Sequence, residues 1–393
     1  MKSGILFSAL FLALIYVNVL ASRQVARHCD DFGKRKTLFL IGIWLMPFIG
    51  ALIASDRTLP PQEPEYGSLP DILAGKSSPP SLLTGSTLGD FDVDAHMAAP
   101  NGVPVLDWKS LDAWARGSFA GSRINEAIEQ GRRAWLLHMV EFMGPYAHLL
   151  ESEQSFILST LEPRIAQAIS RYVTATRRRI GRVLKGIADF PAEEKDILLI
   201  LDNEAEYYHY VATYYPDRGE FAASGGMFID AGCPHFVVVR ADWEFIEPVI
   251  AHEMTHLALS HLRLPRWLDE GIAVNTERRL AGANKLLFTP HELHKKHLRF
   301  WNQERIQEFW SGKSFNRTDD GNLLSYELAR IIVEQLAKQW DSFSCFVTSA
   351  ACEDAGAAAA QNALAVNLGT LVAALLERPE ESGWAPDPGS WLE

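Results

Sequence analysis

Apolar and polar positions alternate with different periods in successive parts of the chain. Residues 108–144 and 161–187 carry apolar side chains at helical spacing, as on one face of an amphipathic helix. The unbroken apolar run Ile197–Leu201 and the β-branched run His235–Arg240 predict strands. The first half of the folded part is therefore expected to mix helices with strands.

Beyond Glu270 the pattern becomes mainly helical, with apolar periodicity over 323–338 and an alanine-rich stretch over 350–376. Strands followed by helices predict an α+β fold with a small mixed sheet and a helical C-terminal lobe. We expect a cleft between the sheet-bearing lobe and the helical lobe.

Two apolar stretches open the chain, Gly4–Ala21 and Leu38–Ala54, with 18 and 17 residues. Each is near the lower limit for a helix that crosses a bilayer. The five basic residues between them favour a cytoplasmic loop under the positive-inside rule, with both ends of the hairpin outside. We therefore predict a transmembrane helical hairpin over 1–54. A cleaved signal peptide is the alternative, because Val19 and Ala21 suit a cleavage site.

Composition divides the rest of the chain into three parts. Residues 55–104 are rich in Pro, Gly, Ser and Asp, which predicts a flexible linker. Residues 105–160 are predicted to form a helical packing segment, and residues 161–393 the main folded domain.

Charge and cysteine content exclude some classes of partner and leave others open. The formal net charge is −12 although basic residues gather near the start, so nucleic acid is not expected as a partner. Of the four cysteines, Cys345 and Cys352 can either pair or remain separate thiols. The count indicates neither redox compartment, and oligomeric state stays open.

The candidate chemistry lies in His252, Glu253 and His256, which form the pattern HEMTH, and in Glu270 fourteen positions later within Trp267–Ala273. Residues four apart lie on one face of a helix, so both imidazoles can reach one metal ion. A catalytic zinc takes three protein ligands, and two histidines with a glutamate are an established set. The alternative is an ordinary buried helix pair in which the pattern arose by chance.

These motifs resemble those of the gluzincin metallopeptidases, in bacterial families with HExxH followed closely by WLxEGxA. The resemblance covers residues 155–380, with the specific motifs confined to 252–273. It implies a zincin-like domain over 161–393 with Zn²⁺ on the two histidines and Glu270, Glu253 as general base and a polypeptide substrate. Metzincins are excluded, because their pattern requires Gly and His where Leu259 and Leu262 stand.

The chain departs from this resemblance at one position. Thermolysin-like members carry an acidic residue one turn after the third ligand to hold a zinc histidine, but Val274 stands here. Ligating histidines nearly always need such a partner. We expect Asp269, Asn275 or a main-chain carbonyl to take this role.

Two further features follow from the same resemblance. Tyr326, near the head of a predicted helix, is the candidate donor to the oxygen that becomes negative during hydrolysis, although it can equally be a packing tyrosine. The strand at His235–Arg240 is expected to border the cleft and hold the substrate backbone. An interior sheet strand is the alternative.

Together these features predict a membrane-anchored zinc peptidase that acts on polypeptides at the outer side of a bacterial cytoplasmic membrane. The alternative is a catalytically inactive gluzincin-like scaffold that binds peptides or membrane-protein partners. Retention of Glu253 argues against the scaffold, because a purely structural site does not need that carboxylate.

Overall fold

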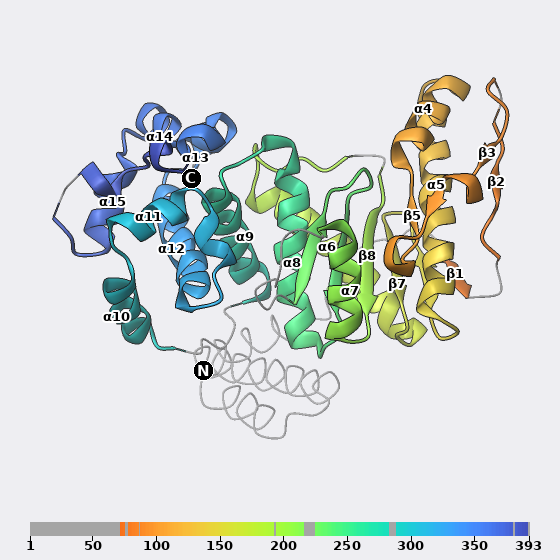
Figure 1. Ribbon diagram of the computed structural model, residues 1–393, viewed down its shortest axis with the longest axis horizontal. Helices are drawn as coiled ribbons and strands as arrows, with labels where there is room; N and C mark the ends of the chain where they lie inside the picture. Colours follow the sequence, from red (N-terminus) through yellow and green to blue (C-terminus); the bar gives the residue numbers. More distant parts are fainter. Residues whose placement is uncertain are drawn as a thin grey trace, which may run out of the picture. The chain divides into compact units, whose positions relative to one another are not determined.

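A six-stranded mixed sheet organises the computed structural model of the chain (Figure 1). The strands are β1 Asp71–Ala74, β6 His148–Glu151, β7 Ser155–Ser159, β8 Asp196–Leu201, β9 Gly226–Ile229 and β10 His235–Val239. In the order β1-β6-β7-β8-β10-β9, strands β7, β8 and β10 are parallel, while the remaining neighbours pair antiparallel. The sheet combined with many helices confirms the predicted mixed α+β class.

The structure describes part of the chain. Every described residue lies in the compact unit Pro70–Glu393. The described ranges are 71–74, 78–85, 87–191, 194–215, 225–282, 288–379 and 382–391. The transmembrane hairpin predicted over 1–54 lies outside them. Within these ranges no single helix has the length and apolarity to cross a membrane, but one sharply bent pair, Ala357–Leu364 with Leu368–Leu375, meets both criteria jointly.

The helices cover both faces of the sheet and form a separate lobe beside it. Their bounds are α4 Trp108–Ser118, α5 Ser122–Met143, α6 Pro163–Val183, α7 Glu204–Tyr214, α8 Trp243–Leu259, α9 Arg266–Ala281, α10 Pro290–Phe300, α11 Gln303–Trp310, α12 Asp320–Leu336, α13 Trp340–Ser349, α14 Ala357–Leu364 and α15 Leu368–Leu375. Figure 1 shows the helices from α9 onward on one side of the sheet, with α4 and α5 on the other.

The position of β8 in the sheet explains why its sequence is an almost unbroken apolar run. It lies between β7 and β10, parallel to both, and all six of its residues are buried. Leu198 and Ile200 belong to the core shared with α6, α8 and the helical lobe, whereas Ile197, Leu199 and Leu201 belong to the core shared with α4, α5 and α7. A strand covered on both faces needs apolar side chains at every position.

Two predicted segment boundaries differ from the structure. The segment 105–160 contains the predicted helices, but its last part forms β6 and β7 of the main sheet and is not a separate helical layer. Apolar runs of four or five residues do not distinguish a strand from a buried helix, which explains the error.

The predicted flexible linker also extends too far. Within 55–104, the described part from residue 78 onward contains the short strands β2 Leu82–Leu83, β3 Phe91–Asp92 and β4 Met97–Ala98, and β5 Val105–Leu106 follows directly. The side chains of Val93 and Val103 are fully buried in the core with α4 and α5. Isolated apolar residues among Pro and Gly therefore act as packing contacts here.

The cysteines of the described part are separate thiols. Cys233 is buried, and Cys345 and Cys352 are exposed. Cys345 and Cys352 form no disulfide, so they follow the predicted alternative of separate thiols.

Candidate metal centre

The helix pair α8 and α9 carries both sequence motifs. A short 3₁₀ turn, Ser260–Leu262, follows α8, and Arg263 then adopts a left-handed conformation with φ of 45°. Pro265 precedes the first residue of α9, as expected for a helix start. The reversal of the chain brings Glu270 back against the histidines of α8, as the sequence predicted.

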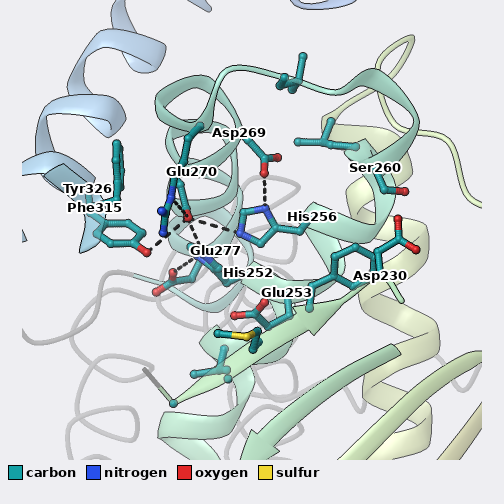
Figure 2. A pocket seen from close by; sticks show the side chains of 18 of the residues that line it. Asp230, His252, Glu253, His256, Ser260, Asp269, Glu270, Glu277, Phe315 and Tyr326 are labelled. Carbon is teal, nitrogen blue, oxygen red and sulfur yellow. Dashed lines mark hydrogen bonds and ion pairs between the residues drawn. The ribbon is translucent and has the colours of Figure 1, made fainter. Parts of the chain in front are cut away.

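The three predicted ligands converge on one point. Ligand atoms of His252, His256 and Glu270 all lie within 4.8 Å of one another. The Oε2 atom of Glu270 lies 3.3 Å from Nε2 of His252 and 3.5 Å from Nε2 of His256. Ligands at zinc bond lengths in a tetrahedral arrangement would be separated by about 3.4 Å. Figure 2 shows the two rings turned toward Glu270.

The remaining ring nitrogens are held by carboxylates. Nδ1 of His256 donates to Asp269 Oδ2 at 2.9 Å, and Nδ1 of His252 donates to Glu277 Oε2 at 3.1 Å. If both imidazoles are neutral, each Nε2 carries a lone pair facing the buried Oε2 of Glu270, which then has no hydrogen-bond donor. Protons on the imidazoles or a metal ion can satisfy three such donors, so the residues present could hold a metal ion.

Asp269 and Glu277 are therefore the hydrogen-bond partners of the two histidines, a role that Val274 cannot take. Asp269 was one of the predicted candidates. The side-chain amide of Asn275 instead donates to the carbonyl oxygens of Gly271 and Arg330, so it does not contact the histidines. The role of Glu277 as a partner of His252 was not predicted from the sequence. Its position two helical turns after Glu270 places it on the same face of α9, which was the available signal.

Nearby carboxylates shift the pKa values of the two histidines. Burial alone would lower the pKa of His252, but hydrogen bonds with Glu270 and Glu277 raise it to about 10. For His256, burial is likewise outweighed by the charges of Asp269 and Glu270, which raise its pKa well above its usual value. The two imidazoles in turn hold the pKa of Glu270 far below its usual range despite burial. The surroundings strongly favour positive charge at this point.

Glu253 lies beside the three ligands without joining them. Burial raises its pKa, and the charge of Glu270 adds to this effect. The two histidines and a hydrogen bond from the backbone N–H of Phe228 act in the opposite direction but do not cancel it. A buried carboxylate with a raised pKa next to a metal position has the properties of a proton acceptor.

Tyr326 reaches the group from the second turn of α12. Its hydroxyl donates to Oε1 of Glu270 at 3.4 Å, a long contact for a hydrogen bond. The approach depends on Gly271, where a Cβ atom would lie 2.7 Å from both the carbonyl oxygen of Ala329 and Cγ2 of Val333. The absence of a side chain at Gly271 thus lets α12 pack closely enough for Tyr326 to contact Glu270.

A cavity of about 750 Å³ opens over these residues. One wall is the edge strand β9, including Gly226 and Phe228, and the opposite wall includes Phe315, Leu323 and Tyr326. The strand predicted to border the cleft, His235–Arg240, is instead β10, which lies inside the sheet between β8 and β9. Four of its five residues, Phe236–Val239, are apolar, which suits an interior strand, so the alternative was correct.

Arg266 also lines the cavity, a position that the sequence did not predict. It lies one turn before Glu270 on α9, and its Nε is 3.6 Å from Glu270 Oε1. Its position within the Arg-Trp-Leu-Asp-Glu run, four residues before a predicted ligand, was the available signal.

Comparisons with protein-family models, with curated proteins and with solved structures found no match for this chain.

Proposed function

We propose that the protein is a zinc-dependent peptidase that hydrolyses peptide bonds with Glu253 as general base. The observation that carries this proposal is the convergence of His252, His256 and Glu270 on one point, with Glu253 beside it. The close helix pair and the antiparallel edge strand beside it support a zincin-like arrangement of the catalytic domain.

A zinc ion held by His252, His256 and Glu270 would supply a Lewis acid that lowers the pKa of a water molecule toward neutrality. Glu253 takes the proton of the attacking water and then passes it to the leaving amine. Tyr326 donates to the carbonyl oxygen as negative charge develops there, which stabilises the transition state more than the substrate. Asp269 and Glu277 keep the imidazoles in the required tautomer and orientation.

Polypeptide is the substrate class that the cavity wall supports best. Strand β9 pairs with β10 along one edge, and within the described ranges no strand pairs with its other edge. An extended peptide can add to such an edge through main-chain hydrogen bonds while neighbouring pockets select side chains. In this proposal the substrate backbone pairs with β9, and not with β10 as predicted from the sequence.

The decisive experiment replaces Glu253 by Gln, which keeps the size of the side chain and removes its basicity. Glu253→Gln should still bind about one zinc per chain, whereas cleavage of a broad peptide library should fall by roughly 10²–10⁴-fold. The matched control is Glu244→Gln on the exposed first turn of the same helix. Undiminished cleavage by Glu253→Gln would show that the proposed base is wrong.

The same library separates the peptidase from the scaffold alternative. A zinc-loaded parent protein that binds peptides, cleaves none and is unaffected by Glu253→Gln would support a catalytically inactive scaffold. Membrane anchorage through 1–54 and an extracytoplasmic catalytic domain complete the proposal on sequence grounds alone. Reporter fusions after residue 100 should give an extracytoplasmic signal, and a cytoplasmic signal would contradict this orientation.

A further inference from the structure

We propose that Arg266 is a second donor to the carbonyl oxygen of the scissile bond, acting together with Tyr326. This inference rests on the peptidase function proposed above and names a further catalytic residue for it.

Arg266 and Tyr326 gather at one oxygen of Glu270. The Oε2 atom of Glu270 faces the two imidazoles, whereas Oε1 lies 3.6 Å from Nε of Arg266 and 3.4 Å from the hydroxyl of Tyr326. The Arg266 guanidinium also acts to lower the pKa of the Tyr326 hydroxyl, against the raising effect of burial. Figure 2 shows Tyr326 and Glu253 on different sides of the ligand group. The donors and the general base can therefore act on different atoms of one substrate.

The helical lobe holds Arg266 in place. Its guanidinium lies 5.3 Å from the centre of the Phe315 ring, and its Nη1 donates to Asn316 Oδ1 at 2.8 Å. Gly312, with φ of 81°, packs against the stem of the side chain, because a Cβ there would lie 3.1 Å from Cβ of Arg266. Donors fixed before the reaction stabilise developing charge without the cost of reorganisation.

A role limited to clamping Glu270 does not account for these contacts. Ammonium or guanidinium groups committed to a carboxylate usually lie at about 2.7–2.9 Å, well below the 3.6 Å observed for Arg266. A guanidinium carries five N–H donors, more than its contacts with Asn316 and Glu270 engage. Arg266 lines the cavity, so donors remain for a substrate oxygen.

During hydrolysis such a donor must stabilise the negative charge that develops on the carbonyl oxygen. When the oxygen of water bonds to the carbonyl carbon, the proton of water passes to Glu253 and the carbonyl oxygen becomes negative. The carbon–nitrogen bond then breaks, and Glu253 returns the proton to the nitrogen. Arg266 and Tyr326 donate hydrogen bonds to the negative oxygen between these two events.

The test compares two peptide ligands on the zinc-loaded full-length protein by calorimetry. A phosphinic peptide carries a tetrahedral anionic centre, whereas a peptide hydroxamate binds metal without one. Arg266→Ala should weaken the phosphinic peptide by roughly 10²-fold and lower kcat more than it raises KM, with zinc affinity and hydroxamate affinity nearly unchanged. Arg266→Lys should recover part of the loss, because it keeps the charge but not the planar fork.

The matched control is Arg279→Ala, which removes the same charge from an exposed position on the same helix. Equal weakening of both peptides, or reduced zinc affinity without selective loss of the phosphinic peptide, would overturn the donor role of Arg266. A parent protein that binds both peptides but cleaves nothing would contradict the peptidase proposal, while the binding comparison would still decide the role of Arg266.

Discussion

Single carboxylates fix the orientation of the candidate ligand histidines. Asp269 accepts from His256 and Glu277 accepts from His252, so removal of either acceptor frees one imidazole to rotate. We expect Asp269→Asn and Glu277→Gln each to weaken zinc binding by roughly 10–100-fold, as measured by competition with a chelating dye.

A suitable control for these two variants is Glu304→Gln, an exposed acidic residue on α11 that does not line the cavity. Zinc affinity equal to that of the parent in both Asp269→Asn and Glu277→Gln would show that the histidines need no such partners.

Protonation of the same histidines predicts a dependence on pH. The pKa of His252 in the folded protein, about 10, lies above its ordinary value near 6.5. Its contribution to stability is therefore complete below about pH 6.5 and is lost as pH rises toward 10. The chelator-treated protein should thus become less stable across this window, with its thermal midpoint falling as pH rises.

Zinc must displace the same protons, because it binds neutral imidazole. Calorimetric titration with zinc at pH 7, in two buffers of different ionisation enthalpy, should show release of roughly one to two protons per ion. Binding without proton release would contradict the pKa assigned to His252.

At the scale of residues, the ligands could be predicted because their spacing along the helices encodes their geometry. Glu277 and Arg266 could not be assigned in the same way, since many helix positions carry acidic or basic side chains. Their roles become visible only when the distances to His252 and Glu270 are known.

The packing of α9 against α12 controls how the site is assembled. Gly271 lies close to α12, and the amide of Asn275 links α9 to α12 through the carbonyl oxygen of Arg330. A methyl group at Gly271 would force the helices apart, which costs about 1–3 kcal/mol in a well-packed core. Gly271→Ala should lower the urea midpoint and also reduce cleavage, because Tyr326 moves with α12.

Gly181 offers the matched control for this prediction. It also lies inside a helix, α6, but a Cβ there would meet no atom within 4 Å. Gly181→Ala should therefore be neutral or stabilise the protein by up to about 1 kcal/mol. A smaller loss of stability in Gly271→Ala than in Gly181→Ala would contradict the packing argument.

Elements with long or strongly periodic patterns were predictable, and short ones were not. The long amphipathic helix α6 and the buried strand β8 follow directly from their apolar periods. Strands β6 and β7 escaped prediction because their apolar runs are short, and because their outer edges pair with distant β1 and β8, which the local sequence does not show.

For the whole molecule, the sheet separates two cores, and the buried apolar residues described between residue 78 and α4 all belong to one of them. Leu83, Phe91, Val93 and Val103 are buried in the core with α4 and α5. Full burial of each such side chain contributes about 1.5–3 kcal/mol, and the sum is comparable to the net stability of a domain.

We therefore expect a protein of residues 105–393 to lose cooperative unfolding, whereas one of residues 70–393 should keep it. Thermal unfolding followed by circular dichroism compares the two. Identical midpoints would mean that residues 70–104 act as the flexible linker that the sequence alone predicted.

The candidate metal ligands and both of their carboxylate partners lie between His252 and Glu277, within one helical hairpin. Only a short loop must close for this hairpin to form, whereas the sheet must join strands far apart in the chain. A cation can therefore be captured early during refolding, before β1 pairs with β6. Added zinc should then increase the refolding rate, and its effect on the rate should be lost in His252→Gln.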